Sequence, residues 1–484
     1  MRKSTFLFIL TMMFSFFIAQ AQLIVSEAIS VTNLDDSYGR KSPKIAVNAA
    51  GEIMVFWMRT GSNESFFIST LINGEFSPPV HIPFGSLNPD LWSGSLGPNM
   101  AAHGDDVYVT FEVYGDAIYV LHSSDGGITW NDPVAAFTPP SGRRATIPVI
   151  AVDDQAQPYI AYVNTNNAEA DAYYAMVRSS DFGETFLEEV DVSVESAGAE
   201  VCECCNGHID IADNGDVYVS FRNNDANLRD IWLAKSSDGG LSFTSAFDVD
   251  ETDWIINACP TNGPHFAIVD SEIIFAFFSG AGAEGSGVYY STFDTEISIA
   301  GATINLPGTD ISSSGLNRPR VAGSGDTLAI VWQESFESSL EIAMSVSTTG
   351  AEGLSSDPFL LTDLVSSQNY PAILYAGNSF HIVCEDALSG TVMYQEVSFG
   401  ILGVDKLQKE AFQMGPNPCE NTLYIRRETN KASEIYIRNV LGKMVRKTPI
   451  VGQDIQLDLS HLSSGLYFVS IGIELENAQK LILR

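Results

Sequence analysis

Four of the six cysteines stand in a pattern that suits either a disulfide or a metal site. Cys202, Cys204 and Cys205 fall within four residues, and Cys259 follows one segment later. Two thiols close a disulfide where their Cα atoms come within reach of each other. We therefore predict a bridge from Cys204 or Cys205 to Cys259, in keeping with the export that the N-terminus indicates below.

Histidines beside these cysteines offer the metal alternative. His208 follows Cys205, and His265 follows Cys259, so two thiolates and two imidazoles are available to Zn²⁺ or Cu(I). Because exported thiolates tend to oxidise, we expect the disulfide and no metal at this cluster. Cys384 lies in an apolar run and is expected in the core, and Cys419 is expected to stay unpaired or to oxidise.

A repeated unit must position these residues. Each unit opens with Pro or Gly and a short apolar strand, and successive units start 50 to 59 residues apart. Four short strands at this period predict an all-β ring of sheets, a β-propeller. We expect seven blades, with six as the alternative if one weak unit is an insertion. The units start at Pro43, Pro98, Pro148, Gly207, Pro264, Pro319 and Pro371.

The last unit shows no fourth strand after Thr391 to Val397. A ring of sheets leaves an open edge unless its two ends pair. We expect the segment Ile24 to Val31 to supply this strand and to lock the ring.

Innermost strands begin near the channel of a propeller, so residues around the unit starts converge on one mouth. Four of the nine arginines in residues 22–410 are among them, and guanidinium groups bind carboxylates. They predict a site for an anionic or hydroxyl-rich ligand, unless polar side chains merely line a wet channel. The residues expected there are Arg40, Asn99, Arg144, Asn206, His208, Asn262, His265, Arg318, Arg320, Asn369 and Tyr370.

Three units contain almost the same octet, at residues 123–130, 179–186 and 236–243. Its Asp, which is Asp125, Asp181 or Asp238, is expected to accept backbone N–H groups across a hairpin, so the octet is structural. These octets resemble the Asp-box, or bacterial neuraminidase repeat, of sialidase-like β-propellers.

The resemblance implies a catalytic site that the sequence only partly matches. Sialidases hold a carboxylate with three arginines and use a Tyr paired with a Glu as nucleophile and an Asp as acid. Tyr370 with Glu334 and Arg318 or Arg320 resembles the late part of that pattern. Arg40 before Pro43 only echoes the early part, and no acid Asp can be assigned.

Three functions therefore stay open. The first is a non-catalytic protein that engages glycans or other extracellular ligands at the funnel. The second is an exo-acting glycoside hydrolase of sialidase type, which releases terminal sialic acid. The third is a structural or adhesion module with a wet channel. Whether the protein is an enzyme stays open, because function lies in the site rather than in the fold.

Charge divides the chain near residue 410. Residues 22–410 hold 14 basic and 53 acidic residues, a net charge of −39, whereas residues 411–484 hold 9 and 7, a net charge of +2. Such acidity repels nucleic acid, so none is expected as a partner. The acidic loops of residues 22–410 contain carboxylates that could bind Ca²⁺, but no loop has the spacing of a known Ca²⁺ site. We expect no cofactor.

The basic end, residues 411–484, alternates like a small antiparallel sandwich. Expected strands span 422–425, 432–438, 454–457, 465–471 and 479–483. With Pro416-Asn417-Pro418, Asn439-Val440-Leu441-Gly442, the run 462–468 and the terminal 480–484, this region resembles the C-terminal sorting domain of type IX secretion in Bacteroidetes. The resemblance implies the type IX machinery as a partner and a product that is released or held at the cell surface.

The N-terminal residues have the pattern of an export signal peptide. Arg2 and Lys3 precede an apolar run from Phe6 to Ile18, and Ala19-Gln20-Ala21 follows as a cleavage signature. We predict a signal peptide over residues 1–21, a propeller over 22–410 and a sorting domain over 411–484. No transmembrane segment is expected in the mature chain.

The sorting function can be tested by truncation. A chain that ends at residue 410 should accumulate in the periplasm, because it lacks the region that the type IX machinery recognises. Fractionation of cells that express either chain measures this. Surface display of the truncated chain at the level of the full chain would contradict the prediction.

Overall fold

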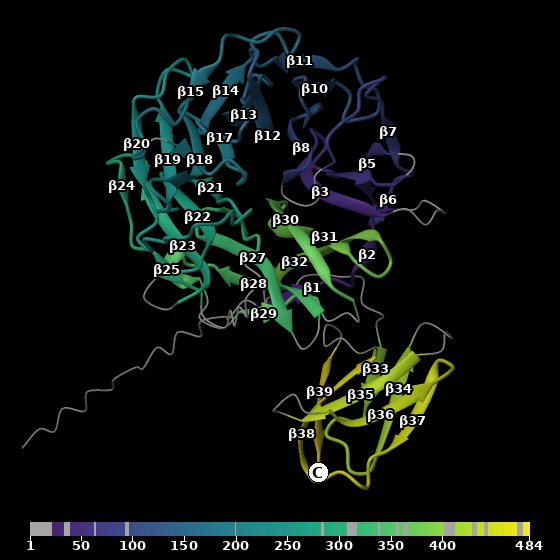
Figure 1. The fold of residues 1–484 in the computed structure, drawn as a ribbon. Helices are drawn as coiled ribbons and strands as arrows, with labels where there is room; N and C mark the ends of the chain where they lie inside the picture. Colours follow the sequence, from purple (N-terminus) through teal and green to yellow (C-terminus); the bar gives the residue numbers. More distant parts are fainter. Residues whose placement is uncertain are drawn as a thin grey trace, which may run out of the picture. The chain divides into compact units, whose positions relative to one another are not determined.

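The computed structural model describes the chain as two compact units. It describes residues 22–32, 39–61, 64–91, 96–198, 200–281, 285–306, 317–336, 339–354, 358–362, 366–400, 412–427, 433–439, 444–471 and 478–484. One unit is Gln22–Gly400, and the other contains the described residues from Phe412 to Arg484 (Figure 1). The predicted signal peptide and the predicted boundary near residue 410 lie outside the described residues.

The first unit is all-β and contains seven antiparallel sheets of four or five strands, set in a ring (Figure 1). Each of the seven repeat units supplies most strands of one sheet, and the N-terminal β1 (Gln22–Val25) and β2 (Ile29–Ser30) join the last sheet. A short 3-10 turn, Ala351–Gly353, follows β28 (Ser339–Ser347). The sheets consist of β3 (Arg40–Val47), β4 (Ile53–Arg59), β5 (Ser65–Ile72), β6 (Glu75–Phe76) and β7 (Val80–Ile82); β8 (Asn99–His103), β9 (Asp106–Glu112), β10 (Ile118–Ser123) and β11 (Val134–Phe137); β12 (Arg143–Val152), β13 (Pro158–Asn166), β14 (Tyr173–Arg178) and β15 (Val190–Asp191); β16 (Glu200–Val201), β17 (His208–Ile211), β18 (Val217–Asn224), β19 (Ile231–Ser236) and β20 (Ser245–Asp248); β21 (His265–Val269), β22 (Glu272–Ser279), β23 (Gly287–Asp294), β24 (Ile299–Ala300) and β25 (Ile304–Asn305); β26 (Arg320–Ser324), β27 (Thr327–Phe336), β28 (Ser339–Ser347) and β29 (Phe359–Leu360); and β30 (Gln368–Ala376), β31 (Ser379–Asp386) and β32 (Thr391–Gly400) with β1 (Gln22–Val25) and β2 (Ile29–Ser30).

Apolar packing between neighbouring sheets holds the ring together. A buried cluster lies between each pair of adjacent sheets, including the pair formed by the first and last units. The second strand of each sheet is covered on both faces, so most of its residues are buried and apolar residues do not alternate strictly with polar ones. In β4 the run Ile53 to Met58 is buried throughout for this reason.

The two ends of the first unit meet in one sheet. β1 pairs with the outer edge of β32 from Gln22 opposite Gly400 to Val25 opposite Val397, and β2 pairs with the same strand. Val31, which follows β2, is fully buried between the first and last sheets. The prediction that the N-terminal segment completes the last blade is confirmed.

Each octet forms a tight turn around its Asp. In the third octet, Asp238 accepts hydrogen bonds from the N–H groups of Leu241 (3.0 Å) and Ser242 (2.9 Å) and from the hydroxyl of Ser242 (2.6 Å). Gly240 has a φ of +82°, a backbone conformation that residues with a Cβ rarely adopt, so the turn favours glycine there. Asp125 and Asp181 make equivalent bonds.

The C-terminal unit is a sandwich of two antiparallel sheets around its own apolar core. Five of its strands match the expected ranges, and the sequence patterns missed Phe412–Gly415 and Met444–Ile450. Its sheets have the orders β33-β34-β37 and β36-β35-β38-β39. The strands are β33 (Phe412–Gly415), β34 (Thr422–Arg427), β35 (Ser433–Asn439), β36 (Met444–Ile450), β37 (Asp454–Asp458), β38 (Gly465–Ile471) and β39 (Gln479–Leu483).

The octet turn should stabilise its blade through the Asp carboxylate. Hydroxyl donors, with Ser242 first and Ser236 next, lower the pKa of Asp238 to about 2. We expect Asp238→Ala to lower the free energy of unfolding by about 1 kcal/mol near neutral pH, because solvent screens the charge of this exposed carboxylate. Because the folded pKa lies below the ordinary 3.8, this stabilisation is present above pH 4 and is lost as the pH falls towards 2.

Urea unfolding of both proteins across this pH range measures the effect. Leu241→Ala is the matched control, because the Leu241 side chain of the same turn is 55% exposed. The control should stay within about 0.5 kcal/mol of wild type. An equal loss in both variants would contradict a role for the carboxylate.

Candidate functional site

A central channel of about 410 Å³ is the candidate site, and residues of all seven sheets line it. The innermost strands β3, β8, β12, β17, β21, β26 and β30 form its wall. Because each of these strands enters the channel wall directly after the Pro or Gly that opens its repeat unit, equivalent positions of the units stand side by side around the channel.

One position in each unit supplies most of the polar wall. It is the residue directly after the opening Pro or Gly. The position two residues later on the same strands is mostly alanine. The polar wall therefore lies at one end of the channel and a ring of small side chains lies deeper. Six residues at the first position line the channel: Lys44, Asn99, His208, His265, Arg320 and Ala372.

The channel wall is positively charged. Lys44, Arg318 and Arg320 line it, whereas Asp210 is the one carboxylate among the described residues that do so. Burial, with the charges of Arg320 and Arg318, lowers the pKa of Lys44 to about 7. Burial and the charge of Arg318 lower the pKa of Arg320 to about 10, so Arg320 stays protonated at neutral pH. A wall whose lining side chains include three basic residues and one carboxylate favours an anionic ligand.

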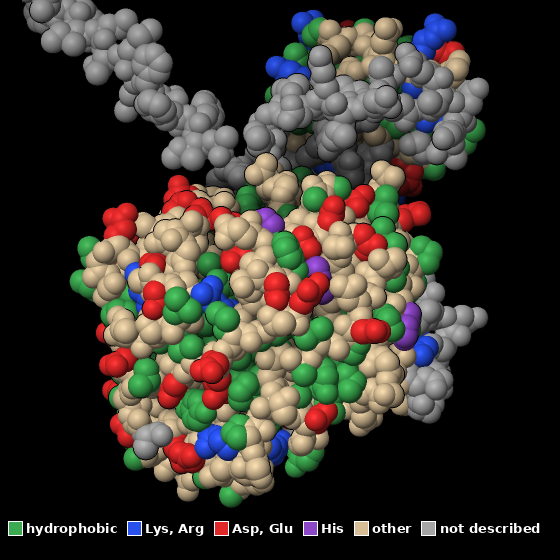
Figure 2. All heavy atoms as spheres, turned by 90° about the horizontal axis from the view of Figure 1, so that it is seen from above, with side chains coloured by type: hydrophobic (Ala, Val, Ile, Leu, Met, Phe, Trp, Pro, Cys, Tyr) green, Lys and Arg blue, Asp and Glu red, His purple; other side chains and the backbone are tan. Residues whose placement is uncertain are grey.

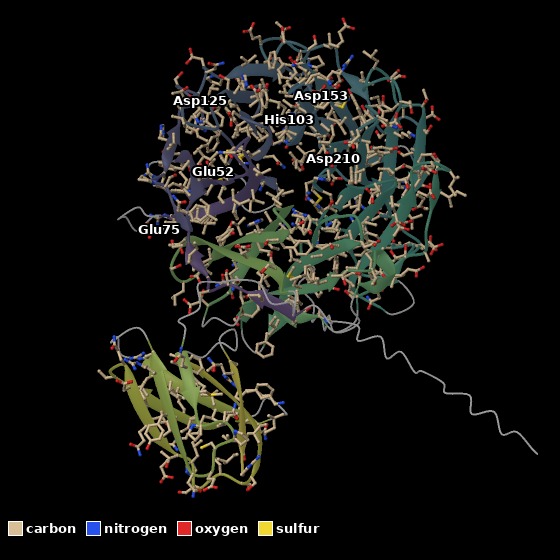
Figure 3. All side chains as sticks on the ribbon, turned by 180° about the vertical axis from the view of Figure 1, so that it is seen from behind. Glu52, Glu75, His103, Asp125, Asp153 and Asp210 are labelled. Carbon is tan, nitrogen blue, oxygen red and sulfur yellow. A yellow bond between two sulfur atoms is a disulfide. The ribbon has the colours of Figure 1, made fainter. Side chains whose placement is uncertain are left out.

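Asp210 lies on the inner side of the ring, in contrast to Asp125 and Glu75 nearer its outside (Figure 3). It accepts the N–H of Ile211 (2.9 Å). Burial and the charge of Asp213 raise the pKa of Asp210 to about 6. At neutral pH this carboxylate offsets only part of the positive charge of the wall.

His208 and His265 stack on each other in the wall, with ring centroids 3.9 Å apart. Nδ1 of His265 accepts the backbone N–H of Val321 (3.3 Å), which leaves the proton on Nε2. Burial and the charge of Arg320 lower the pKa of His208 to about 3, and burial with His208 holds the pKa of His265 well below its ordinary value. Both rings are therefore neutral donors at physiological pH.

Tyr370 and Arg318 form a pair at the mouth. The Arg318 guanidinium lies over the Tyr370 ring, 4.5 Å from its centroid, and also donates to the carbonyl of Thr261 (3.3 Å). The Tyr370 N–H donates to Oε1 of Gln333 (2.9 Å). Glu334 is buried and accepts the indole N–H of Trp332 (2.8 Å). Adjacent residues on a strand face opposite ways, so Gln333, not Glu334, is placed against the Tyr370 segment.

Bulges at the starts of the inner strands create this mouth. The register of β3, β12 and β30 shifts next to its Pro, and the residue before each Pro has a positive φ: Ser42, Ile147 and Tyr370. A side chain of the preceding blade accepts the N–H that each bulge exposes. Those acceptors are Glu385 for Ser42 (2.7 Å), Glu112 for Ile147 (3.3 Å) and Gln333 for Tyr370 (2.9 Å).

Two predicted ligand residues, Arg40 and Arg144, are not among the described residues that line the channel. Arg144 lies over the Tyr114 ring (4.3 Å) and pairs with Glu169 (3.1 Å). Arg40 is buried opposite Arg59 in the strand pair β3–β4. Both arginines lie before the bulge of their strand, and only the residues after the bulge form the channel wall.

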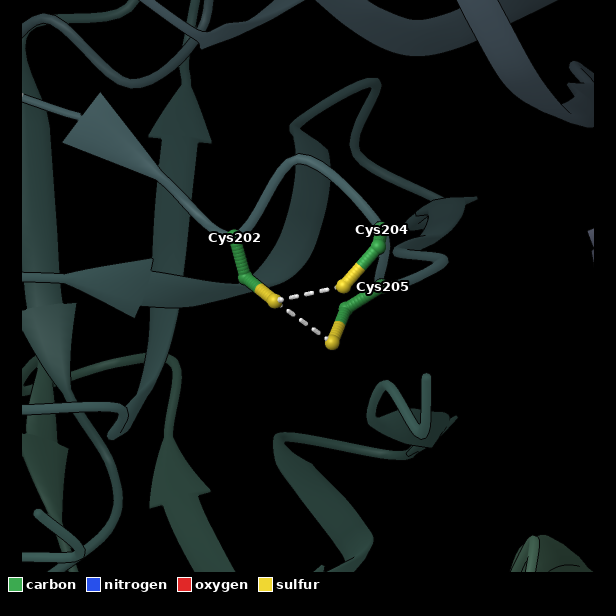
Figure 4. Close-up of side chains that lie close together, drawn as sticks. All are labelled: Cys202, Cys204 and Cys205. Atoms are coloured by element: carbon green, nitrogen blue, oxygen red, sulfur yellow. Dashed lines mark hydrogen bonds between the residues drawn. The ribbon is translucent and has the colours of Figure 1, made fainter. Parts of the chain in front are cut away.

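The predicted disulfide is present and joins Cys204 to Cys259, with Cα atoms 6.2 Å apart. Cys205 is not the partner: it is buried beside Cys202, with sulfur atoms 2.7 Å apart (Figure 4). Among the described residues, the metal-type cluster is Cys202, Cys204 and Cys205, without either histidine. Two sulfur ligands of one Zn²⁺ stand about 3.7 Å apart, so the Cys202–Cys205 distance does not suit a metal.

Sequence patterns missed Lys44, Asp210, Gln333 and Glu385. Alignment of the repeat units could have found the first two. Lys44 directly follows the opening Pro, as Arg320 does, and Asp210 lies two residues further along its strand, as Ala322 does. Gln333 and Glu385 carry no signal that we recognise: each lies near the end of an apolar strand, and its partner belongs to the next blade.

Comparison with known proteins identifies the C-terminal unit. Residues 413–484 match the model of the secretion system C-terminal sorting domain. The chain therefore carries a type IX sorting domain. It is a protein of Bacteroidetes that is secreted or attached to the outer membrane. No helix of the described residues is long and apolar enough to cross a membrane.

No curated protein matches the sequence. Solved structures resemble the propeller unit in fold. A protein of unknown function from Dyadobacter fermentans has a TM-score of 0.48 and 15% identity, over 68% of this chain and 99% of that one. Polysaccharide lyase Uly1 has a TM-score of 0.47 and 9% identity, over 74% and 89%. A leech intramolecular trans-sialidase has a TM-score of 0.44 and 9% identity, over 78% and 94%.

The buried acceptor Glu385 should make stability depend on pH. Burial raises the pKa of Glu385 to about 7, above its ordinary 4.5, so wild type loses stability as the pH rises through this window. Glu385→Gln keeps an oxygen for the Ser42 N–H and does not ionise. We expect the variant to gain stability relative to wild type between pH 4.5 and 7, by at most about 3 kcal/mol.

Thermal or urea unfolding from pH 4 to 8 tests this expectation. Glu75→Gln is the control, because Glu75 is exposed on β6. The control should follow wild type at every pH. Parallel profiles for Glu385→Gln and wild type would show that Glu385 does not titrate in this window.

Proposed function

We propose that the propeller unit binds an acidic sugar, a glycan unit that carries a carboxylate, at the polar end of its channel. The observation that carries the proposal is an inversion of charge. Residues 22–410 have a net charge of −39, yet the channel wall holds Lys44, Arg318 and Arg320 against Asp210 alone among its described residues. Figure 2 shows acidic side chains spread over the visible face of the molecule, in contrast to the mainly basic charged residues of the channel wall.

Each lining group has a part in this proposal. Arg318 and Arg320 present guanidinium forks that match a carboxylate, and Lys44 adds a charge. Asn99 and the neutral imidazoles of His208 and His265 offer hydrogen bonds to hydroxyl groups. Together they suit a ligand that is both anionic and hydroxyl-rich.

Titration calorimetry of the mature chain tests the binding. N-acetylneuraminic acid and galacturonic acid serve as probes, and galactose is the neutral control. We expect Arg320→Met to weaken binding of the acids at least about tenfold, since a hydrogen bond to a charged group contributes about 1.5–3 kcal/mol. Arg59→Met is the control, because Arg59 is not among the described lining residues of the channel.

Binding should also fall as the pH rises through about 7, because Lys44 loses its proton there. Lys44→Met should bind more weakly at pH 6 and lose the part of the pH dependence that Lys44 supplies. Asp210 and Glu385, with pKa values of about 6 and about 7, account for the dependence that remains. Equal affinity for galactose and the acids, or no effect of Arg320→Met, would overturn the proposal.

A second candidate function is hydrolysis of a terminal acidic sugar. One observation favours it: the Tyr370 ring contacts the Arg318 guanidinium, and Glu385, whose charge reaches Arg318, has a pKa of about 7. A carboxyl group with such a pKa suits proton transfer. The test is turnover of fluorogenic sialosides and other exo-glycoside substrates by wild type and by Tyr370→Phe. Turnover that the variant loses would support it, and no turnover on the whole panel would reject it.

A further inference from the structure

A short turn between β16 and β17 brings two buried thiols together. The N–H of Cys205 donates to the carbonyl of Cys202 (3.3 Å), so the two cysteines occupy the first and last positions of a β-turn. Such positions lie within about 7 Å at their Cα atoms, a separation that a disulfide spans. Both side chains are fully buried.

The sulfur atoms are closer than unbonded atoms pack. Sγ of Cys202 and Sγ of Cys205 are 2.7 Å apart (Figure 4). Unbonded carbon atoms rest at about 3.5–4.0 Å, and sulfur is larger than carbon. The turn therefore holds the pair nearer to the about 2.05 Å of a disulfide bond than to an ordinary contact.

The disulfide Cys204–Cys259 lies beside this pair. Sγ of Cys202 is 3.6 Å from Sγ of Cys204, and Cys259 is exposed to solvent. An oxidant or reductant in solution thus reaches the Cys204–Cys259 bond directly, whereas it cannot touch Cys202 or Cys205.

Buried cations favour a thiolate in the turn. Arg222 is fully buried and donates to the backbone carbonyls of Asn262 (3.2 Å) and Phe278 (2.7 Å). Burial alone opposes ionisation, but the hydrogen bond from Cys202 and the charge of Arg222 bring the pKa of Cys205 below its ordinary value. Burial and the bond to Cys205 raise the pKa of Cys202. A thiolate is the species that attacks a disulfide.

We propose that Cys202 and Cys205 form a second, buried disulfide, which is made and broken by exchange with Cys204–Cys259. The Cys205 thiolate takes the proton of Cys202 along their hydrogen bond, and Cys202 attacks Sγ of Cys204. The Cys204–Cys259 bond breaks, and Cys259 leaves as a thiolate that accepts this proton from Cys205. Cys205 then attacks Sγ of Cys202, the Cys202–Cys204 bond breaks, and Cys204 leaves as a thiolate. A small disulfide such as oxidised glutathione restores Cys204–Cys259 and is itself reduced to two thiols, which accept the two electrons and two protons.

This pair of disulfides fixes one part of the channel mouth. Cys205 directly precedes Asn206, and His208 follows two residues later. The hydroxyl of Tyr174 donates to the carbonyl of Cys205 (3.0 Å), and Asn206 accepts the N–H of Gly263 (3.3 Å). Oxidation of the turn therefore holds the segment that leads two lining residues into the channel.

Peptide mapping of the native mature chain tests the bond. Free thiols are alkylated with N-ethylmaleimide during unfolding, and the protein is cleaved after glutamate without reduction. Cleavage after Glu203 separates Cys202 from Cys204 and Cys205. We expect alkylation of Cys384 and Cys419 only, and one linked product that joins the peptides of Cys202, Cys205 and Cys259. Alkylated Cys202 and Cys205 after incubation with oxidised glutathione would overturn the proposal.

The exchange route is tested by kinetics. Chains reduced in the folded state are mixed with oxidised glutathione, and alkylatable Cys202 and Cys205 are counted over time. Removal of the exposed pair in Cys204→Ser/Cys259→Ser should slow oxidation of the buried pair on the order of tenfold or more, because glutathione then waits for local opening. Cys384→Ser is the control and should match wild type. Equal rates in the double variant and wild type would overturn the exchange step.

Discussion

Face-to-face packing of apolar sheets around a closed ring is the constraint on which the propeller unit depends. Each sheet buries its central strands between two neighbours, so no sheet is stable alone and the last must meet the first. β1 and β2 make that meeting possible, because they pair with β32 and bring Val31 into the core between the end sheets. The ring is thus held by pairing between residues more than 370 positions apart in the sequence, such as Val25 and Val397.

Ring closure also creates the candidate site. Seven innermost strands surround the channel, and the first wall position of five units supplies a polar side chain to its mouth: Lys44, Asn99, His208, His265 and Arg320. The same geometry explains the bulges, because a turn into the channel frees a backbone N–H that a side chain of the preceding blade must satisfy. Glu385 and Gln333 meet that need, and they tie the shape of the mouth to the packing of the blades. The packing of the blades therefore positions the charged side chains of the channel wall.

The packing of neighbouring blades also brings the cysteines together. Cys204 reaches Cys259 because the loops before two successive inner strands run side by side. The turn that presents Cys204 outward turns Cys202 and Cys205 inward, towards the buried Arg222. One four-residue turn thus combines an accessible disulfide with a protected dithiol, a combination that suits a protein exported to an oxidising compartment.

The sequence by itself determined the all-β repeat, the N-terminal closing strand and the sorting domain, because each rests on local patterns: strand periodicity, turn residues and ordered motifs. It also located Arg318, Arg320, His208, His265 and Tyr370 near one mouth. Only the tertiary structure decided that Arg40 and Arg144 lie outside the channel wall, that Gln333 faces the Tyr370 segment, and that Cys204 takes Cys259 while Cys202 meets Cys205. Those outcomes depend on bulges and on contacts between blades, which no local pattern records, since a one-residue shift of register turns a side chain to the other face.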